Sequence, residues 1–290
     1  MDVFKAIILG LVQGLAEFLP VSSSGHLILA REILNVPGNY LTFDIMLHVA
    51  TLFAIFAVFY KELSALFKPP FKTIGLIALA TVPAGIAGLI YAKLDLTVFD
   101  SAKYLCFFFI ISAGLMLVAD LLERRRAKSV GAEDDAKSVG AEDARDDAKT
   151  DAKGGAGTGG RQSTGVESIT LKTAVCMGLM QGVAVFPGVT RSGSTIFGGI
   201  AAKGEKNSVA KFSFFMSAPV ILAAAAFDIF DGGAGLPVDA WCYVAGMAAA
   251  FVSGFFAIKL MLRVVGKARL RWFALYLAVL SVVTFSLYFI

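Results

Sequence analysis

Six long apolar segments limit what this chain can fold into. They lie near residues 41–60, 74–92, 104–122, 208–227, 240–262 and 271–290. Each is close to the length of about 20 residues that an α-helix needs to cross a bilayer. The chain as a whole is 57% hydrophobic, with a mean hydropathy of +0.76. We therefore expect an all-α integral membrane protein with six transmembrane helices.

The remaining composition excludes several other classes of protein. The formal net charge of +4 is small and lies in loops, so it bears on membrane orientation and does not indicate nucleic-acid binding. Cys106, Cys176 and Cys242 lie in apolar context without a CxxC pair, which predicts small buried residues rather than disulfides or a zinc site. The N-terminus has no basic n-region or cleavage site, so no signal peptide is expected.

A 19-residue segment occurs twice, at residues 10–28 (GLVQGLAEFLPVSSSGHLI) and 178–196 (GLMQGVAVFPGVTRSGSTI). The two copies share ten identities in 19 positions aligned without a gap. Only the first copy carries Glu17 and His26, and only the second carries Arg191, in its turn. This division predicts one composite site, with an acid and an imidazole from one hairpin and a guanidinium from the other.

The repeat divides the chain into two halves, residues 1–122 and 169–290, each with one copy and three spans. Because three is odd, the second half must be inverted relative to the first. Each copy is interrupted by proline or glycine. Broken hairpins in inverted repeats are typical of transporter folds, where they meet near the bilayer midplane. We therefore expect two re-entrant helical hairpins, at residues 1–40 and 169–203.

Residues 123–168 separate the two halves and have a different composition. The run AKSVGAED occurs at 127–134 and again at 136–143, with mixed charges and no aromatic residue. Such a segment buries too little apolar surface to offset its ordering entropy. We therefore expect a disordered cytoplasmic linker.

Loop charges predict the orientation in the membrane. The loop at 228–239 carries Asp but neither Lys nor Arg, whereas the loops at 61–73, 123–128 and 263–271 are basic. The positive-inside rule places the basic loops in the cytoplasm and the acidic loop outside. Counting spans back from there, the first hairpin opens to the outside and the second to the inside.

Both repeat tips combine hydroxyl residues with glycine just before the start of a helix. Backbone amides at a helix N-terminus bind anions, and a guanidinium such as that of Arg191 can grip phosphate oxygens in bidentate fashion. The two tips together therefore predict a phosphate or pyrophosphate site, although the hydroxyls could instead merely cap broken helices. The candidate binding residues are Ser22, Ser24, Gly25, Gly188, Thr190, Ser192, Gly193, Ser194 and Thr195.

Glu17 is a charged residue in an otherwise apolar helix, so it needs a partner or a task. Gln13 lies four residues earlier on the same face, and the pair offers oxygen ligands to a divalent cation such as Mg²⁺ or Ca²⁺. The alternative is a structural ion pair between Glu17 and Arg191 without a metal.

His26, beside serines and opposite an arginine, is a candidate nucleophile or general acid–base, or else simply a hydrogen-bonded histidine. His48 is equally suited to line the cavity or to pack at a helix interface.

The two tips resemble the signature motifs of the bacterial undecaprenyl-pyrophosphate phosphatase family, also called the bacitracin-resistance family. The (E/Q)xxxE, PVSSxGH and PGxSRSGxT motifs of this family appear as Gln13–Glu17, Pro20–His26 and Pro187–Thr195. Thr190 replaces the more usual serine and keeps the hydroxyl. Gln13 replaces the frequent Glu, which removes one negative charge from the predicted metal site. The resemblance covers both apolar halves, whereas the family's connector is usually shorter than residues 123–168.

The resemblance implies a multi-pass enzyme of the bacterial plasma (inner) membrane, with its active site facing the periplasmic, outer side. Such an enzyme hydrolyses undecaprenyl pyrophosphate to the monophosphate, which recycles the lipid carrier of peptidoglycan synthesis and confers bacitracin resistance. The resemblance also implies dependence on a divalent cation. Glu17, His26 and Arg191 match the family's catalytic positions, and Ser23 matches a hydroxyl thought to take part. The attacking group stays open among Ser23, His26 and a metal-bound water, with a preference for the two tip residues.

The main alternative is a transporter or flippase of a phosphorylated polyprenyl lipid, because inverted repeats with midplane hairpins are also typical of transporters. Glu17 together with His26 favours the enzyme, since anion transport needs only cationic and amide donors. The expected partners are the lipid substrate and the membrane, without nucleic acid. The sequence leaves the oligomeric state open, a homodimer included.

Overall fold

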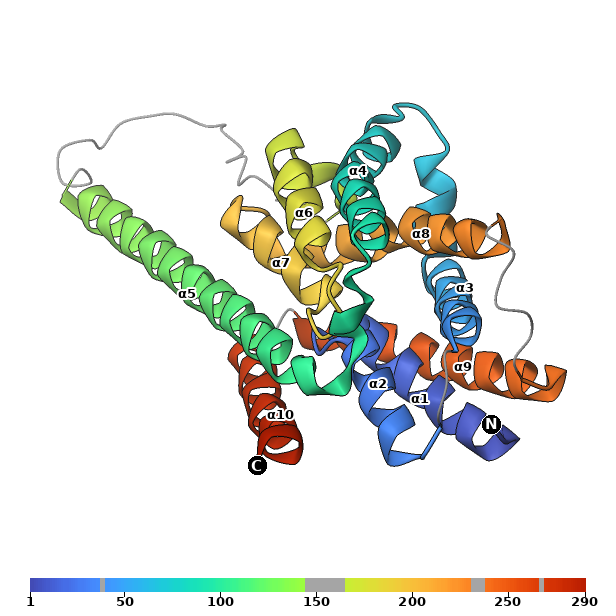
Figure 1. Ribbon diagram of the computed structural model, residues 1–290. Helices are drawn as coiled ribbons and strands as arrows, with labels where there is room; N and C mark the ends of the chain where they lie inside the picture. Colours follow the sequence, from blue (N-terminus) through green and yellow to red (C-terminus); the bar gives the residue numbers. More distant parts are fainter. Residues whose placement is uncertain (37–39, 144–164, 231–237, 266–268) are drawn as a thin grey trace.

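The computed structural model describes residues 1–36, 40–143, 165–230, 238–265 and 269–290, and this part of the chain contains helices and no β-strand (Figure 1). The helices of the first half are α1 (Val3–Phe18), α2 (Ser23–Ile33), α3 (Leu41–Leu66), α4 (Lys72–Lys93) and α5 (Leu105–Asp143). The short 3-10 helices η1 (Leu96–Asp100) and η2 (Ala102–Tyr104) connect α4 to α5. The second half comprises η3 (Val166–Ser168), α6 (Leu171–Val183), α7 (Arg191–Ala201), α8 (Lys206–Phe230), α9 (Ala240–Val265) and α10 (Arg271–Phe289).

Six stretches of helix in the described residues are long and apolar enough to cross a bilayer. They are Leu41–Leu66, Lys72–Lys93, Ala102–Ser129, Lys206–Asp228, Ala240–Arg263 and Arg271–Phe289. Each overlaps one of the apolar segments of the sequence, so the prediction of an all-α membrane protein with six spans is confirmed. The re-entrant course of the hairpins and the inversion of the halves are defined relative to the membrane plane, and they stay predictions.

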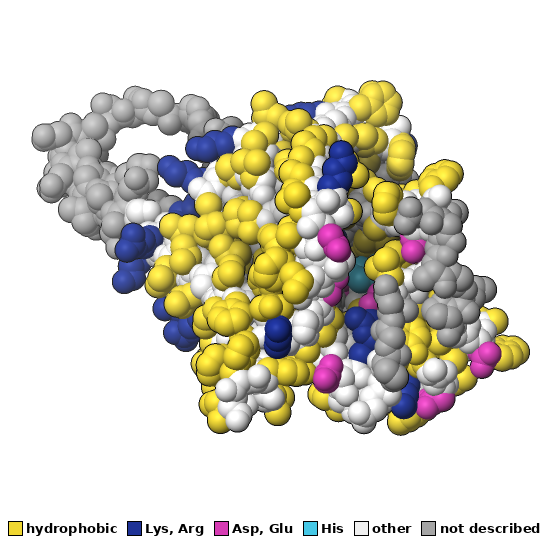
Figure 2. Space-filling model, viewed as in Figure 1, with side chains coloured by type: hydrophobic (Ala, Val, Ile, Leu, Met, Phe, Trp, Pro, Cys, Tyr) yellow, Lys and Arg dark blue, Asp and Glu magenta, His cyan; other side chains and the backbone are white. Residues whose placement is uncertain are grey.

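The outer surface of the spanning helices is apolar. Figure 2 shows hydrophobic side chains over much of one face of the molecule. Phe53, Val82 and Ile110, on three different spanning helices, are each more than half exposed. A water-soluble protein rarely exposes apolar surface on this scale, so the surface is suited to contact with lipid.

The two copies of the repeat form helical hairpins of the same plan, α1 with α2 and α6 with α7. Ser22 caps α2, since its Oγ accepts the amide of Gly25 at 3.4 Å. Thr190 caps α7, since its Oγ1 accepts the amide of Gly193 at 3.2 Å. Ser22 and Thr190 are aligned in the repeat, and so are the two glycines. The duplication therefore extends to the way in which the second helix of each hairpin begins.

The first helix of each hairpin packs against a spanning helix of the other half, α1 along α9 and α6 along α4 (Figure 1). Glycines of the repeat allow the close approach. A Cβ atom at Gly10 would lie 2.1 Å from the carbonyl oxygen of Gly246 on α9. At the aligned position, a Cβ atom at Gly178 would lie 2.6 Å from the carbonyl oxygen of Ala80 on α4. Small residues at such crossings are the usual means of packing helices in a membrane, and here they interlock the two halves.

Helix α5 continues to Asp143, well into the segment 123–168 that the sequence predicted to be disordered. The physical reason is that residues 123–143 are rich in Ala, Glu, Lys and Arg, which favour a helix, and extending an existing helix avoids the cost of nucleation. Residues 144–164 lie outside the described part of the chain, and the prediction made for them is untested.

Candidate active site

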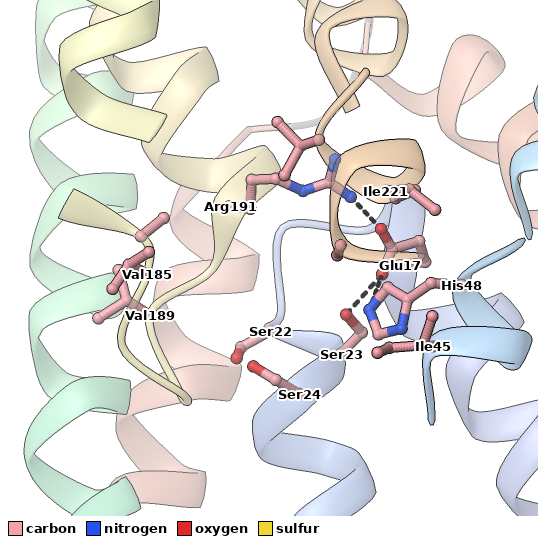
Figure 3. Close-up of a pocket in the computed structure, with 13 residues that line it drawn as sticks. Glu17, Ser22, Ser23, Ser24, Ile45, His48, Val185, Val189, Arg191 and Ile221 are labelled. Carbon is pink, nitrogen blue, oxygen red and sulfur yellow. Dashed lines mark hydrogen bonds and ion pairs between the residues drawn. The ribbon is translucent and has the colours of Figure 1, made fainter. Parts of the chain in front are cut away.

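The two tips meet where Glu17, in the last turn of α1, pairs with Arg191, the first residue of α7. The guanidinium of Arg191 donates from Nη2 to Glu17 Oε1 (Figure 3). The Glu17 side chain is only 2% exposed, so its charge lies away from solvent. A buried carboxylate is tolerated when it is paired and hydrogen-bonded, and the guanidinium of the other half provides the countercharge. The acid and the guanidinium of the composite site expected from the repeat thus meet in the fold.

The second oxygen of the Glu17 carboxylate is the focus of three further groups. Ser23 Oγ donates to Oε2 at 2.6 Å and Gln13 Nε2 donates to it at 3.0 Å. His48 Nε2 lies 3.5 Å from the same oxygen. Figure 3 shows Ser23 and His48 side by side below the carboxylate, with Arg191 reaching it from above. The hydroxyl of Ser23 is therefore held against a base.

A cavity of about 260 Å³ lies at this cluster. The first hairpin and α3 contribute Glu17, Ser22, Ser23, Ser24, Ile45 and His48. The second hairpin and α8 contribute Ala184, Val185, Val189, Arg191, Val220, Ile221 and Ala224. Polar groups able to hold a phosphate thus share one cavity with an apolar wall.

Two buried polar atoms beside this cavity have no hydrogen-bond partner among the described residues. They are Arg191 Nη1 and Gln13 Oε1. A buried donor or acceptor without a partner costs free energy unless a ligand satisfies it. Arg191 Nη1 is the second arm of a fork whose first arm is on Glu17, so it can donate to an oxygen of a phosphate.

His26 does not line the cavity, although the sequence placed it in the site. Its Nδ1–H donates to the carbonyl of Ser22 at 2.7 Å, and Tyr276 Oη donates to its Nε2 at 2.6 Å. The His26 and Tyr276 rings are stacked, with centroids 5.7 Å apart. Nδ1 is thus bound to the first tip and Nε2 to α10, so neither nitrogen supplies the imidazole expected beside Glu17 and Arg191. The catalytic role expected of His26 stays a prediction.

His48 takes that place instead. Its Nδ1–H donates to the carbonyl of Asp44 one turn earlier in α3, at 2.8 Å, which leaves Nε2 facing Glu17. The sequence offered the signal, a histidine one turn after an aspartate in an apolar span, but it left open whether the residue lines the cavity or packs between helices. The fold decides for the cavity, because α3 and α1 pack together.

Most hydroxyl residues of the second tip support the tip rather than facing the cavity. Ser192 Oγ donates to the carbonyl of Leu19 at 3.0 Å, which ties the second tip to the first. Thr195 Oγ1 lies 2.6 Å from Ser213 Oγ on α8. The cavity lining does not include the predicted binding residues Gly25, Gly188, Thr190, Ser192, Gly193, Ser194 and Thr195. For these residues the capping and packing alternative describes the observed geometry, whereas Ser22, Ser24 and Arg191 do face the cavity.

Ser112 of α5 is a residue of the site region that the sequence did not single out. Its Oγ donates to the carbonyl of Gly188 at 3.1 Å and accepts the amide of Thr190 at 3.0 Å. Gly188 has a φ of +92°, and a Cβ there would lie 2.8 Å from Phe108 Cβ. Ser112 therefore fixes the turn that precedes Arg191. Only the fold reveals this role, because a serine in an apolar span has no distinctive pattern.

A second cavity, of about 670 Å³, adjoins the first and is more polar. It shares Ser24, Ile45, His48 and Val185 with the first cavity. It also contains Arg31, which pairs with Asp44, and Asp100 of η1. Burial raises the pKa of Asp100, opposed by a hydrogen bond from Tyr91 and by the charge of Arg31. This cavity suits water and small ions.

Comparison with known proteins agrees with these motifs. The chain matches the family model described as bacitracin resistance protein BacA over residues 6–283. The chain belongs to this family. An undecaprenyl-diphosphatase of Carboxydothermus hydrogenoformans is 35% identical over 97% of this chain and 96% of its own length. Proteins of the same name from Treponema denticola and Parabacteroides distasonis are 35% and 34% identical to this chain. In both cases the match spans 98% of the relative's length. The resemblance drawn from the two tips is confirmed.

The bacitracin-resistance family implies a divalent cation, and the residues present offer a partial site for one. No group of three or more His, Cys, Asp or Glu residues in the described part of the chain could hold a metal. However, Gln13 Oε1 is buried beside the Glu17 carboxylate and has no hydrogen-bond partner among the residues that the structure describes. One carboxylate and one amide oxygen suit Mg²⁺ when phosphate oxygens of a substrate and water complete its shell. The donor set therefore fits a cation that is held jointly with the substrate.

Proposed function

We propose that this protein is an undecaprenyl-diphosphatase that removes the terminal phosphate of undecaprenyl pyrophosphate in the cavity between the two tips. The observation that carries the proposal is the environment of Glu17. Its buried carboxylate accepts the hydroxyl of Ser23 and pairs with Arg191, whose Nη1 has no protein partner in the described residues. A nucleophile, a base and a phosphate-binding cation therefore meet within one chain, and the mechanism does not require a homodimer.

Ser23 is the best-placed nucleophile. Its hydroxyl proton points at Glu17 Oε2, so the carboxylate can accept that proton while Oγ attacks the terminal phosphorus. A bond forms between Ser23 Oγ and this phosphorus, and the phosphoanhydride bond breaks. Undecaprenyl phosphate leaves and takes the proton from Glu17. Because Ser23 is the first residue of α2, the helix dipole stabilises negative charge that develops on its oxygen.

Hydrolysis of the phosphoserine completes the reaction. Glu17, ionised again, accepts a proton from a water that attacks the same phosphorus. The bond to Ser23 Oγ breaks, the serine recovers a proton, and inorganic phosphate is released. One water is consumed for each substrate, and Glu17 and Ser23 return to their initial states.

Arg191 binds the phosphates and sets the state of Glu17. Nη2 remains on the carboxylate and keeps it ionised, while Nη1 donates to an oxygen of the terminal phosphate. A divalent cation held by Gln13, Glu17 and the pyrophosphate would offset part of the phosphate charge.

We place this protein in the plasma membrane with the site open to the outer side. The second cavity is lined by Tyr40 and Leu41 at the start of α3. Thr42 donates to Asp228 near the end of α8, at 3.4 Å, so both ends lie together. The loop after Asp228 is the acidic loop that the positive-inside rule puts outside. This geometry supports access to the site from that side.

The test is phosphate release from undecaprenyl pyrophosphate by purified protein in detergent with Mg²⁺. We expect Ser23→Ala, Glu17→Gln and Arg191→Gln each to lower kcat by roughly a hundredfold or more. Ser24→Ala is the matched variant, because Ser24 Oγ accepts the amide of Gly188 and does not contact Glu17. It should lose much less activity than Ser23→Ala. Chelation of Mg²⁺ should abolish release, and adding it back should restore release.

Two outcomes would contradict parts of this proposal. Folded wild-type protein that releases no phosphate with cation present would instead favour a transporter of phosphorylated polyprenyl lipid. Equal losses in the Ser23 and Ser24 variants would leave hydrolysis in place but remove Ser23 as the nucleophile, and water activated by Glu17 would then be the attacking group.

A further inference from the structure

One wall of the active-site cavity is formed, among the described residues, by apolar side chains alone. Helix α8 contributes Val220, Ile221 and Ala224 to it, and the second tip adds Ala184 and Val185. The polar groups Glu17, Ser23, His48 and Arg191 are grouped around the carboxylate instead. The cavity is therefore divided into a part suited to phosphate and a part suited to hydrocarbon.

The apolar wall reaches the outer surface of the molecule. Ala224 is exposed, and Phe227, three residues further along α8 on the same side, is 57% exposed. In the second hairpin, Val183 is 47% exposed and directly precedes Ala184, which lines the cavity. Because the α8 residues lie within a candidate membrane span, this edge of the cavity opens toward lipid.

The second cavity has a different character. It contains the charged side chains of Arg31, Asp44 and Asp100. A hydrocarbon chain placed there would separate these groups from water, which costs free energy for each charge that loses its solvation. The polar cavity is therefore the unfavourable route for a prenyl tail, and α8 is the favourable one.

We infer that the polyprenyl chain of the substrate leaves the active-site cavity across α8, against Val220, Ala224 and Phe227. The inference rests on the proposed function, because it requires a substrate that carries such a chain. The cavity of about 260 Å³ is too small to enclose a long polyprenyl chain, so most of the chain must lie outside it. The methyl group of Ala224 leaves the exit open at the point where cavity and surface meet.

The first experiment compares Ala224→Leu with Ala223→Leu. Both alanines are exposed on α8, but only Ala224 lines the cavity. We expect Ala224→Leu to raise KM for undecaprenyl pyrophosphate by on the order of tenfold, because added methyl groups occupy the exit, and Ala223→Leu to leave KM within a factor of about two. Equal KM values for the two variants would overturn the inference.

The second experiment needs no variant and does not depend on hydrolysis. Wild-type protein is irradiated with a polyprenyl pyrophosphate that carries a diazirine in its isoprene units nearest the pyrophosphate, and the adducts are located by mass spectrometry. We expect adducts within residues 220–227 of α8. Adducts on Leu27, Ile28 or Leu41, which line the second cavity, would overturn the inference. Phosphate release by the same preparation separates this failure from a failure of the proposed function.

Discussion

His26 contacts the backbone of the first tip at Ser22. Ser22 has a φ of +70°, a left-handed conformation that disfavours residues with a side chain. The Nδ1–H of His26 holds the carbonyl of Ser22, and Tyr276 fixes the ring from the other side. Since Ser23 follows directly and donates to Glu17, we expect the ring of His26 to help set the position of the nucleophile proposed above. At the scale of single residues, we therefore propose that His26 is a positioning residue.

The replacement His26→Asn tests this role. The side-chain amide of Asn can donate to the Ser22 carbonyl much as Nδ1 does, whereas it cannot supply Nε2. We expect His26→Asn to keep roughly a third or more of the wild-type kcat, and His26→Ala to lose roughly five- to tenfold, the effect of about 1 kcal/mol from one lost hydrogen bond. Phosphate release measures both values, and thermal melting in detergent checks that the variants are folded. Equal, near-complete loss in both would mean that Nε2 takes part in the chemistry.

At the scale of the elements, the first glycine of each repeat copy lies at a helix crossing and not in a turn. Gly10 on α1 and Gly178 on α6 each contact a backbone carbonyl of the other half. Around Gly114, on the spanning part of α5, no described atom lies within 4 Å of the position that a Cβ would take. Glycine therefore has opposite effects on stability at different positions. It allows close packing at a helix crossing, whereas elsewhere it only weakens the helix.

Alanine substitutions at these glycines should change stability in opposite directions. Gly10→Ala should lower the free energy of unfolding by about 1–3 kcal/mol, because a new Cβ collides with the Gly246 carbonyl and the two backbones must separate. Gly114→Ala should be neutral or raise it by up to about 1 kcal/mol, because alanine is the better helix former and the space is open. Thermal unfolding in detergent, monitored by circular dichroism at one protein concentration, ranks the wild type and the two variants by stability. A Gly10→Ala variant as stable as Gly114→Ala would refute the packing argument.

The sequence could predict the elements and the Glu17–Arg191 contact, because apolar length defines the spans and the repeat carried complementary charges at matching tips. It placed His26 in the site and left open whether His48 lines the cavity or packs between helices. The positions of the two histidines depend on α10, which supplies Tyr276 to His26, and on the packing of α3 against α1, which brings His48 to Glu17. The sequence also predicted disorder for residues into which α5 continues. Composition alone does not show that a helix nucleated upstream can extend into such a segment.

The two halves of the molecule also match in structure beyond the 19 aligned residues of the repeat. Helix α2 is followed by Asn35 with a φ of 49°, and helix α7 by Lys203 with a φ of 66°. These positions are separated by the same 168 residues as Gly10 and Gly178, so the second helices of the hairpins also end alike. Both residues are exposed. They are equivalent points of the two halves, and an inverted arrangement must put them on opposite sides of the membrane.

Cysteine labelling at these two positions tests the inversion of the whole molecule. Asn35→Cys and Lys203→Cys are made in a protein whose Cys106, Cys176 and Cys242 are replaced by alanine, and whole cells are treated with a membrane-impermeant maleimide. We expect Asn35→Cys to react in intact cells and Lys203→Cys to react only after the membrane is permeabilised, because the positive-inside rule puts the first hairpin's opening outside and the basic segment around Lys203 inside. Full labelling of both in permeabilised cells is the control for accessibility. Reaction of both from the same side would exclude inverted halves, and the site would then have to be reached by a different route from the one proposed.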